Sequence, residues 1–161
     1  MYLRKAELSD TELLAELRLE FTEVCEGDRE YEPLKESCLR YFEKAFADNT
    51  CDAMLAEDNG KIIGTGIVFY YDSVPSPFNI TGKNAYITSM YVSPEYRHQG
   101  IGSQLLECVI EAARKRGYVI IMLNASEAGR GLYEKHGFSD IHNGMLLNLR
   151  EQADRIQLET V

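Results

Sequence analysis

Hydrophobic residues follow two patterns along the chain, and the two patterns predict strands and helices in a mixed order. Short apolar runs bounded by turn residues are typical of strands, and apolar residues that return every three or four positions are typical of helices. The predicted strands are residues 2–5, 51–57, 61–71, 84–92, 118–123 and 145–150. The predicted helices are a segment between Ser9 and Gly27, then residues 33–47, 101–116 and 127–135. This order predicts one mixed α/β domain over residues 1–161.

Residues typical of helix ends and turns support these boundaries. Ser9 and Glu12 fit a capping box, in which the Ser9 hydroxyl accepts a hydrogen bond from a helical N–H and Glu12 reaches back. Gly117 follows the third predicted helix as a typical C-terminal cap. The pair Asn59-Gly60 is a signal for a hairpin turn. Residues 72–83 contain two prolines and a glycine, which predicts a loop.

The composition excludes several classes of partner and location. The formal net charge is −9, whereas nucleic-acid binding needs clustered Lys and Arg, so no nucleic-acid partner is expected. No apolar run reaches the ~20 residues that cross a bilayer, and the N-terminus lacks the apolar stretch of a signal peptide. The expected location is the cytoplasm, with no membrane partner. Cysteines at positions 25, 38, 51 and 108 form no Cys-x-x-Cys pair, which favours reduced thiols over a disulfide or a metal site.

The segment from Val92 to Ser103 joins a strand to the strongest helix through a turn that contains Gly100 and Gly102. The first N–H groups of a helix have no partner inside the helix and lie at the positive end of its dipole, so such an end binds phosphate. Arg97 adds a charge that can pair with phosphate. The alternative is that glycine serves only the geometry of the turn. The segment is neither a Walker A loop nor a complete dinucleotide-binding fingerprint.

Residues 91–102, with the sequence YVSPEYRHQGIG, resemble the acetyl-CoA signature of the GNAT N-acetyltransferase superfamily, Gln/Arg-x-x-Gly-x-Gly/Ala. Arg97, Gly100 and Gly102 fill its defining positions. A second segment, Asn124 followed by LYEKHGF at residues 132–138, is similar to a second motif of that family. The resemblance extends to about residue 150. It implies a GNAT-like α/β fold: a mixed, mostly antiparallel sheet flanked by helices, with a splayed central strand pair at the cofactor site.

The resemblance also implies acetyl-CoA as co-substrate, with no metal. Main-chain N–H groups would hold its pyrophosphate, and they belong to Arg97, His98, Gln99, Gly100, Ile101, Gly102 and Ser103. The main chain at the end of the splayed strand would pair with the pantetheine arm, through Met90, Tyr91 and Val92. A donor N–H there can polarise the thioester carbonyl. Asn124 is a further candidate for cofactor contact, and its alternative role is a helix N-cap or turn residue.

Two tyrosines are the candidate catalytic residues. Tyr133 occupies a motif position at which the family often uses a tyrosine to protonate the departing CoA thiolate, and a phenol can donate that proton. The alternative for Tyr133 is packing beside Leu132 and Phe138. Some family members carry a glutamate base at the position that Tyr86 occupies here, so a carboxylate base is not expected at this position. Tyr86 can relay a proton through water, bind substrate or simply pack.

The acceptor is expected to be an amine whose identity the sequence leaves open. Residues 20–36 contain seven acids and two bases. They form either a solvated face or an acidic rim for a cationic amine. A homodimer is common in the family. The alternative to an enzyme is a regulatory module that binds acyl-CoA without turnover, and amine-stimulated CoA release distinguishes the two.

Overall fold

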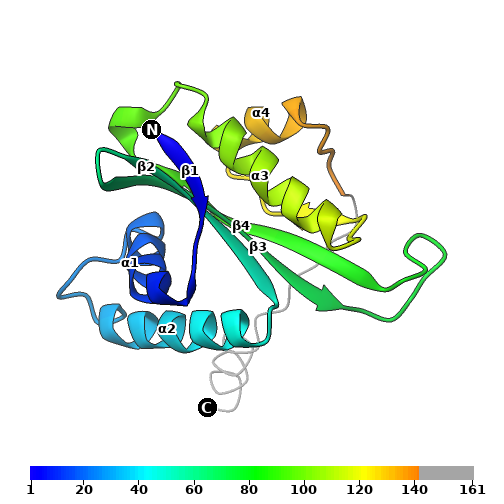
Figure 1. The fold of residues 1–161 in the computed structure, drawn as a ribbon, viewed down its shortest axis with the longest axis horizontal. Coiled ribbons are helices and arrows are strands. Elements are labelled where there is room, and N and C mark those ends of the chain that lie inside the picture. Colours follow the sequence, from blue (N-terminus) through cyan, green and yellow to red (C-terminus); the bar gives the residue numbers. More distant parts are fainter. Residues whose placement is uncertain (142–161) are drawn as a thin grey trace, which may run out of the picture. The chain divides into compact units, whose positions relative to one another are not determined.

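The structure is a computed structural model that describes residues 1–141, in which the chain forms two compact units (Figure 1). The first unit, Met1–Ser126, contains a five-stranded sheet, and the second unit begins at Glu127. The strands are β1 (Tyr2–Lys5), β2 (Cys51–Asp58), β3 (Lys61–Asp72), β4 (Lys83–Val92) and β5 (Ile121–Leu123). The helices of the first unit are α1 (Thr11–Phe21), α2 (Tyr31–Ala47) and α3 (Ile101–Lys115), with short 3₁₀ turns η1 (Leu8–Asp10) and η2 (Pro94–Tyr96). The helix of the second unit is α4 (Glu127–Lys135).

The sheet has the order β1-β2-β3-β4-β5, so strands that follow one another in sequence are also neighbours in space. The pairs from β1 to β4 are antiparallel, whereas β4 and β5 are parallel. Parallel neighbours need a long crossover connection, and α3 forms that connection here. The predicted fold class, a mixed and mostly antiparallel sheet flanked by helices, is confirmed.

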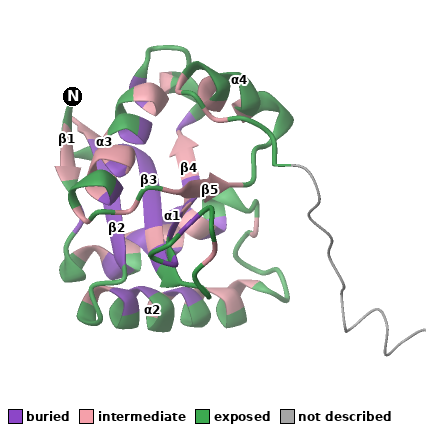
Figure 2. Cartoon of the chain, turned by 90° about the vertical axis from the view of Figure 1, so that its right-hand side faces the viewer, coloured by how far each residue is buried: buried purple, intermediate pink, exposed green. Residues whose placement is uncertain are grey.

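Helices of the first unit cover both faces of its sheet (Figure 1). On one face, Leu14 of α1 and Phe42 of α2 pack in a cluster with Leu55 of β2. On the other face, Leu105 of α3 packs with Ala56, the next residue of β2. Consecutive strand residues point to opposite faces, so this one strand contributes to both clusters. Figure 2 shows the buried residues concentrated on the central strands β2 and β3.

The expected capping box at Ser9 is wrong. The chain instead forms η1 before α1, and the N–H of Glu7 donates to the carboxylate of Asp10 over 2.8 Å. Arg4 holds the same carboxylate with two hydrogen bonds of 2.8 Å each. An ionised carboxylate is a stronger acceptor than a hydroxyl, and the contact with Arg4 fixes the position of the Asp10 carboxylate. The helix therefore begins at Thr11, after Asp10.

Most other predicted elements are confirmed, with ends that move by one or two residues. The predicted strand 118–123 is the exception, because only Ile121–Leu123 forms strand and its residues are half-buried. Tyr118 leaves the strand and stacks on Tyr70, with ring centroids 4.5 Å apart. The first helix ends at Phe21, earlier than its apolar pattern suggests. The predicted strand 145–150 lies outside the described residues.

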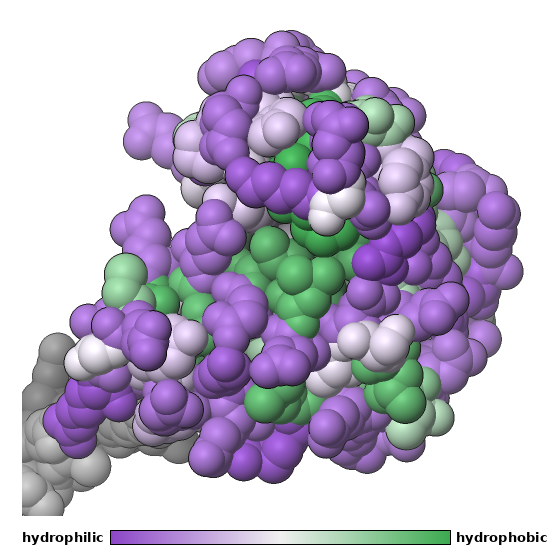
Figure 3. Space-filling model, turned by 60° about the vertical axis from the view of Figure 1, so that its left-hand side comes forward, coloured by the Kyte–Doolittle hydropathy of each residue, from purple (hydrophilic) through white to green (hydrophobic). Residues whose placement is uncertain are grey.

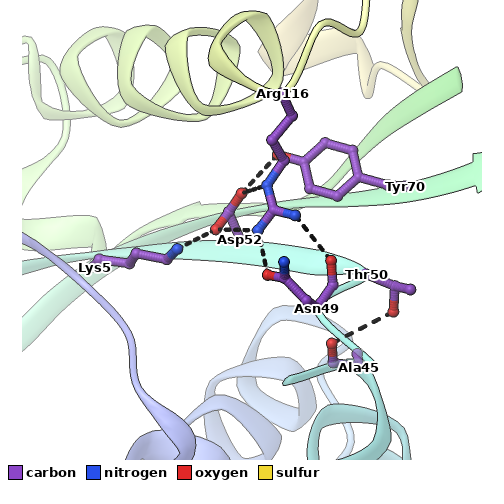
Figure 4. Close-up of polar contacts among 7 residues, drawn as sticks. All are labelled: Lys5, Ala45, Asn49, Thr50, Asp52, Tyr70 and Arg116. Atoms are coloured by element: carbon purple, nitrogen blue, oxygen red, sulfur yellow. Dashed lines mark hydrogen bonds and ion pairs between the residues drawn. The ribbon is translucent and has the colours of Figure 1, made fainter. Parts of the chain in front are cut away.

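A buried carboxylate joins the first three strands to the C-terminal end of α3 (Figure 4). Asp52 of β2 is 2% exposed. It accepts hydrogen bonds from Nε of Arg116 at 2.7 Å and from the hydroxyl of Tyr70 at 2.8 Å, and it lies 2.5 Å from Nζ of Lys5. Arg116 also donates to the carbonyl of Asn49 over 2.9 Å. This cluster fixes one end of α3 on the sheet, and the opposite end of α3 forms the candidate site described below.

We expect Asp52→Asn to lower the free energy of unfolding by about 3 kcal/mol at neutral pH, because it leaves the partly buried Arg116 without its counterion. Burial raises the pKa of Asp52, but hydrogen bonds from Arg116, Lys5 and Tyr70 outweigh burial and hold that pKa below its ordinary value. The stability from this carboxylate is therefore present above the unfolded-state pKa of about 3.9 and is lost as pH falls through the folded-state value. Denaturant unfolding at a series of pH values measures the effect.

Glu95→Gln is the matched control, because its pairing with Lys61 over 3.0 Å is exposed to solvent. Exposed ion pairs contribute little to stability, so this variant should unfold like the original protein. The difference between Asp52→Asn and the original protein should shrink as pH falls below about 4. If the free energies of unfolding of Asp52→Asn and the original protein differ by the same amount at pH 3 and at pH 7, the ionised carboxylate has no stabilising role.

Figure 3 shows one face that is mostly hydrophilic, with hydrophobic side chains gathered near its middle. Within residues 1–141, no helix is long and apolar enough to cross a membrane. Cys38 and Cys51 are buried, Cys25 is exposed, and all four cysteines are free thiols.

Candidate active site

Strand β4 contains a β-bulge, and this bulge shapes the candidate site. The register with β3 shifts there, so that Gly66 of β3 lies opposite two residues, Ser89 and Met90. Ser89 has φ +50°, in the left-handed region. A Cβ atom at Gly66 would lie 2.8 Å from Sδ of Met90, so glycine is needed for the Met90 side chain to lie there. Because a bulge interrupts the alternation of side chains, the consecutive residues Thr88 and Ser89 both line one cavity.

The strands β4 and β5 separate just before the bulge (Figure 2). They pair over Ala85–Ile87 and Ile121–Leu123 only, and no other strand of residues 1–141 continues along that edge of β4. An unpaired strand edge can pair with the main chain or with amide groups of another molecule. The opening fits the splayed pair that the resemblance implies. The β4 residues past the opening include the three expected to meet the pantetheine arm, Met90, Tyr91 and Val92.

The turn after β4 contains two residues with positive φ. His98 and Gly100 both lie in the left-handed region, with φ +62° and +83°. A Cβ at Gly100 would meet no atom of the described chain within 4 Å, so its backbone conformation, rather than crowding, favours glycine. Arg97 is exposed on this turn, and its Nε donates to the carbonyl of Val92 over 2.9 Å. The neighbouring Gln99 is also exposed.

The N-terminus of α3 opens directly from this turn. Its first hydrogen bond runs from the N–H of Gln104 to the carbonyl of Gly100, over 3.1 Å. The N–H groups of Ile101 and Gly102 come before that bond, at the positive end of the helix dipole. The side chain of Ile101 is buried, so only its main chain can serve a ligand, and Ser103 follows in the same turn. The arrangement suits an anion such as a pyrophosphate.

A cavity of about 530 Å³ lies beside the bulge, between the α1–α2 layer and the sheet. It contacts Arg18 of α1, Cys38 and Phe42 of α2, Phe69 of β3, and Thr88 and Ser89 of β4. Its volume is within the range of small-molecule sites. The cavity therefore reaches Ser89, the residue immediately before Met90, where the predicted cofactor segment begins.

Tyr86 lies on the sheet face that borders this cavity. It is the cross-strand partner of Phe69, and the two rings lie 5.3 Å apart. Two residues along β4, Thr88 lines the cavity, and residues two apart on a strand share a face. The packing role considered for Tyr86 is thus present, and its catalytic role stays a prediction.

Asn124 and Tyr133 belong to different units. Asn124 is exposed and follows β5 directly. Since α4 begins at Glu127, its N-cap position is Ser126, and Asn124 lies two residues before that position. In the second unit, Tyr133 packs edge-to-face on Phe138 at 5.9 Å, and burial raises the pKa of the Tyr133 hydroxyl. The cofactor role of Asn124 and the acid role of Tyr133 stay predictions.

The sequence reasoning missed Arg18 and Ser89. Nη1 of Arg18 donates to Oγ of Ser89 over 3.1 Å, which joins α1 to the bulge. A signal for Arg18 was present, because it occupies an apolar position of its helix, four residues after Leu14 and three before Phe21. The polar pair Thr88-Ser89 inside an apolar strand was the matching signal in β4.

Comparison with known proteins agrees with this geometry. A crystal structure of a predicted acetyltransferase from Clostridium acetobutylicum, solved with acetyl-CoA, matches with a TM-score of 0.85 and 35% identity, over 93% of this chain and 97% of that one. The thialysine N-epsilon-acetyltransferase of Sus scrofa is 32% identical over 50% of this chain and 46% of its own length. The [ribosomal protein bS18]-alanine N-acetyltransferase of Escherichia coli K12 is 32% identical over 61% of this chain and 64% of its length.

The chain thus spans about half the length of the first of these curated relatives. The family model described as the Acetyltransferase (GNAT) family matches residues 12–138, which include the bulged strand, the glycine turn and α4. The chain belongs to the GNAT family of acetyltransferases.

Proposed function

We propose that this chain is an acetyl-CoA-dependent N-acetyltransferase that moves an acetyl group directly to a primary amine. One observation carries the proposal: the open edge of β4 leads straight into the glycine turn and the N-terminus of α3. These two features, in a chain of the GNAT family, suit the amide-containing arm and the pyrophosphate of one extended molecule. The acetyl-CoA in the Clostridium acetobutylicum structure supports the same choice of co-substrate.

The residues that would hold acetyl-CoA divide into two groups. The main chain of Met90, Tyr91 and Val92 would pair with the arm along the open edge. The N–H groups from Arg97 to Ser103, together with the Arg97 guanidinium, would hold the pyrophosphate. Asn124 is placed after β5, the strand that borders the opening. Bound acetyl-CoA would supply the acetyl group as a thioester.

The chain's own groups would then assist direct transfer. A main-chain N–H past the bulge would polarise the thioester carbonyl, which is the arrangement that stabilises developing negative charge on oxygen. Tyr133 would donate a proton to the departing sulfur, because a phenol with the ordinary tyrosine pKa of about 10 is protonated at neutral pH. Burial raises the pKa of Tyr133 further. Tyr86 borders the cavity from which an amine would approach, and would relay the amine's proton through water.

Release of CoA thiol from acetyl-CoA, measured across a panel of primary amines, tests this function. We expect release that depends on both the protein and an amine, and that saturates with each. Binding of acetyl-CoA without release for any amine would instead support a regulatory acyl-CoA-binding module. Mass spectrometry of the amine product should show one added acetyl group.

A further inference from the structure

Arg18 is the unusual residue in the cavity beside the bulge. It is half-buried, its Nη1 is bonded to Oγ of Ser89, and its guanidinium carbon lies 5.3 Å from the centre of the Phe21 ring. Two other half-buried arginines of the first unit each pair with carboxylates: Arg4 with Asp10, and Arg116 with Asp52. Arg18 has no ion pair with a carboxylate of residues 1–141. A guanidinium has five N–H donors, so most of the donor capacity of Arg18 remains for a ligand.

The other charges that line the cavity cancel each other. Lys44 and Asp48 lie on its wall and form an ion pair with one another. None of the seven acids in residues 20–36 is among the lining residues, although they could have formed an acidic rim. Three of those acids have partners elsewhere: Tyr91 for Glu20, the N–H of Cys25 for Asp28, and Arg40 for Glu36. Arg18 thus gives the cavity an uncompensated positive charge.

The position of Arg18 relates this charge to the reaction. Its partner Ser89 directly precedes Met90, the first residue of the predicted cofactor segment. An acceptor in the cavity would present its amine to that segment, while Arg18 would hold a different group of the same acceptor molecule. The remaining walls are largely aromatic and apolar, with Phe42 and Phe69 among them.

We propose that this cavity binds the acceptor, and that Arg18 recognises an anionic group on it, a carboxylate or a phosphate. The substrate class is therefore a small amine that carries an acidic group, rather than a polyamine. This inference rests on the proposed function for the transfer step.

The test uses pairs of amines that differ only in the acidic group: an amino acid and its amide, and an amino sugar phosphate and its unphosphorylated form. The original protein should show a higher kcat/KM for the acidic member of at least one pair. If that pair is the amino acid and its amide, the recognised group is a carboxylate; if it is the amino sugar pair, the recognised group is a phosphate. Arg18→Gln should lower the ratio of kcat/KM between acidic and neutral members by about 10–100-fold, the scale of a lost charge-assisted hydrogen bond. Arg18→Lys, which keeps the charge but loses the planar fork, should lower it less.

Arg40→Gln is the matched control, because Arg40 is exposed on α2, pairs with Glu36 and does not line the cavity. It should leave the ratio unchanged. Circular dichroism melting of each variant shows whether it is folded. A polycation or a neutral amine that outperforms every acidic partner would overturn the inference, as would an unchanged ratio in a folded Arg18→Gln.

Calorimetric titration of the same amines into the CoA-bound protein separates this inference from the proposed function. If no amine is acetylated but acidic amines bind in an Arg18-dependent way, recognition of the acidic group by Arg18 stands and the proposed function fails. If amines are acetylated but acidic ones neither bind nor react better, the inference fails and the proposed function stands. Failure of both measurements overturns both.

Discussion

Tyr133→Phe should slow the chemical step by ~10²–10⁴-fold, the usual contribution of general acid catalysis. The substitution keeps the ring that packs on Phe138 and removes only the hydroxyl, so folding and acetyl-CoA affinity should change little. The loss should therefore appear in kcat, while the KM for acetyl-CoA stays near its original value. Single-turnover kinetics is the right measurement, because slow product release can hide the chemical step at steady state.

Tyr71→Phe is the control for loss of a tyrosine hydroxyl. Tyr71 lies exposed near the end of β3, away from the glycine turn in sequence and outside both segments that resemble family motifs. Its variant should react at the original rate. Tyr133 is not the acid if the folded Tyr133→Phe protein performs the chemical step as fast as the original.

Gly102→Glu should abolish the thermal stabilisation by acetyl-CoA while leaving the free protein folded. Glutamate is a better helix residue than glycine and suits the first turn of a helix, so α3 itself should tolerate the change. Its carboxylate would lie where the pyrophosphate is proposed to bind, and opposing like charges cost several kcal/mol, which weakens binding by ~100-fold or more. In the original protein, acetyl-CoA at a hundred times its Kd should raise Tm by about 5–10 °C.

Gly102→Ala is the matched control, because the signature that the turn resembles accepts glycine or alanine at this position. It should keep most of the shift in Tm. A Gly102→Glu protein that is folded and still shows the full shift would show that the turn does not hold the cofactor.

The strand and helix pattern was predictable because it depends on local spacing. The apolar stripe of residues 101–116 specified α3, and the Asn59-Gly60 pair marked the turn between β2 and β3. The glycine turn was predictable for the same reason: a left-handed residue at position 100 favours glycine, and the positive helix end follows directly.

The features that sequence reasoning missed depend on specific side-chain contacts, between residues six to 71 positions apart. Asp10 replaced Ser9 at the start of the first helix because Arg4 holds its carboxylate. The bulge places Ser89 at positive φ, and the side chain of Met90 beside it lies close to Gly66 of the neighbouring strand. The contact of Arg18 with Ser89 joins residues 71 positions apart. No local pattern encodes such pairs.

The proposal of an acid-bearing acceptor likewise depends on tertiary structure. From sequence, the acids of residues 20–36 were interpreted either as a solvated face or as an acidic rim for a cationic amine. In the folded first unit they lie outside the cavity lining, whereas Arg18 lies within it. The sign of the charge that a substrate meets therefore depends on which helix face borders the cavity.

Transfer of an isotopically labelled acetyl group tests the central claim most directly. Acetyl-CoA labelled in its acetyl carbon is mixed with the protein and an amine, and labelled product and free CoA are counted together. The proposed function predicts that the label appears on the amine nitrogen in a one-to-one ratio with released CoA, at a rate that needs both protein and amine. Label that remains entirely on bound acetyl-CoA, with no amine acetylated across the whole panel, would contradict it.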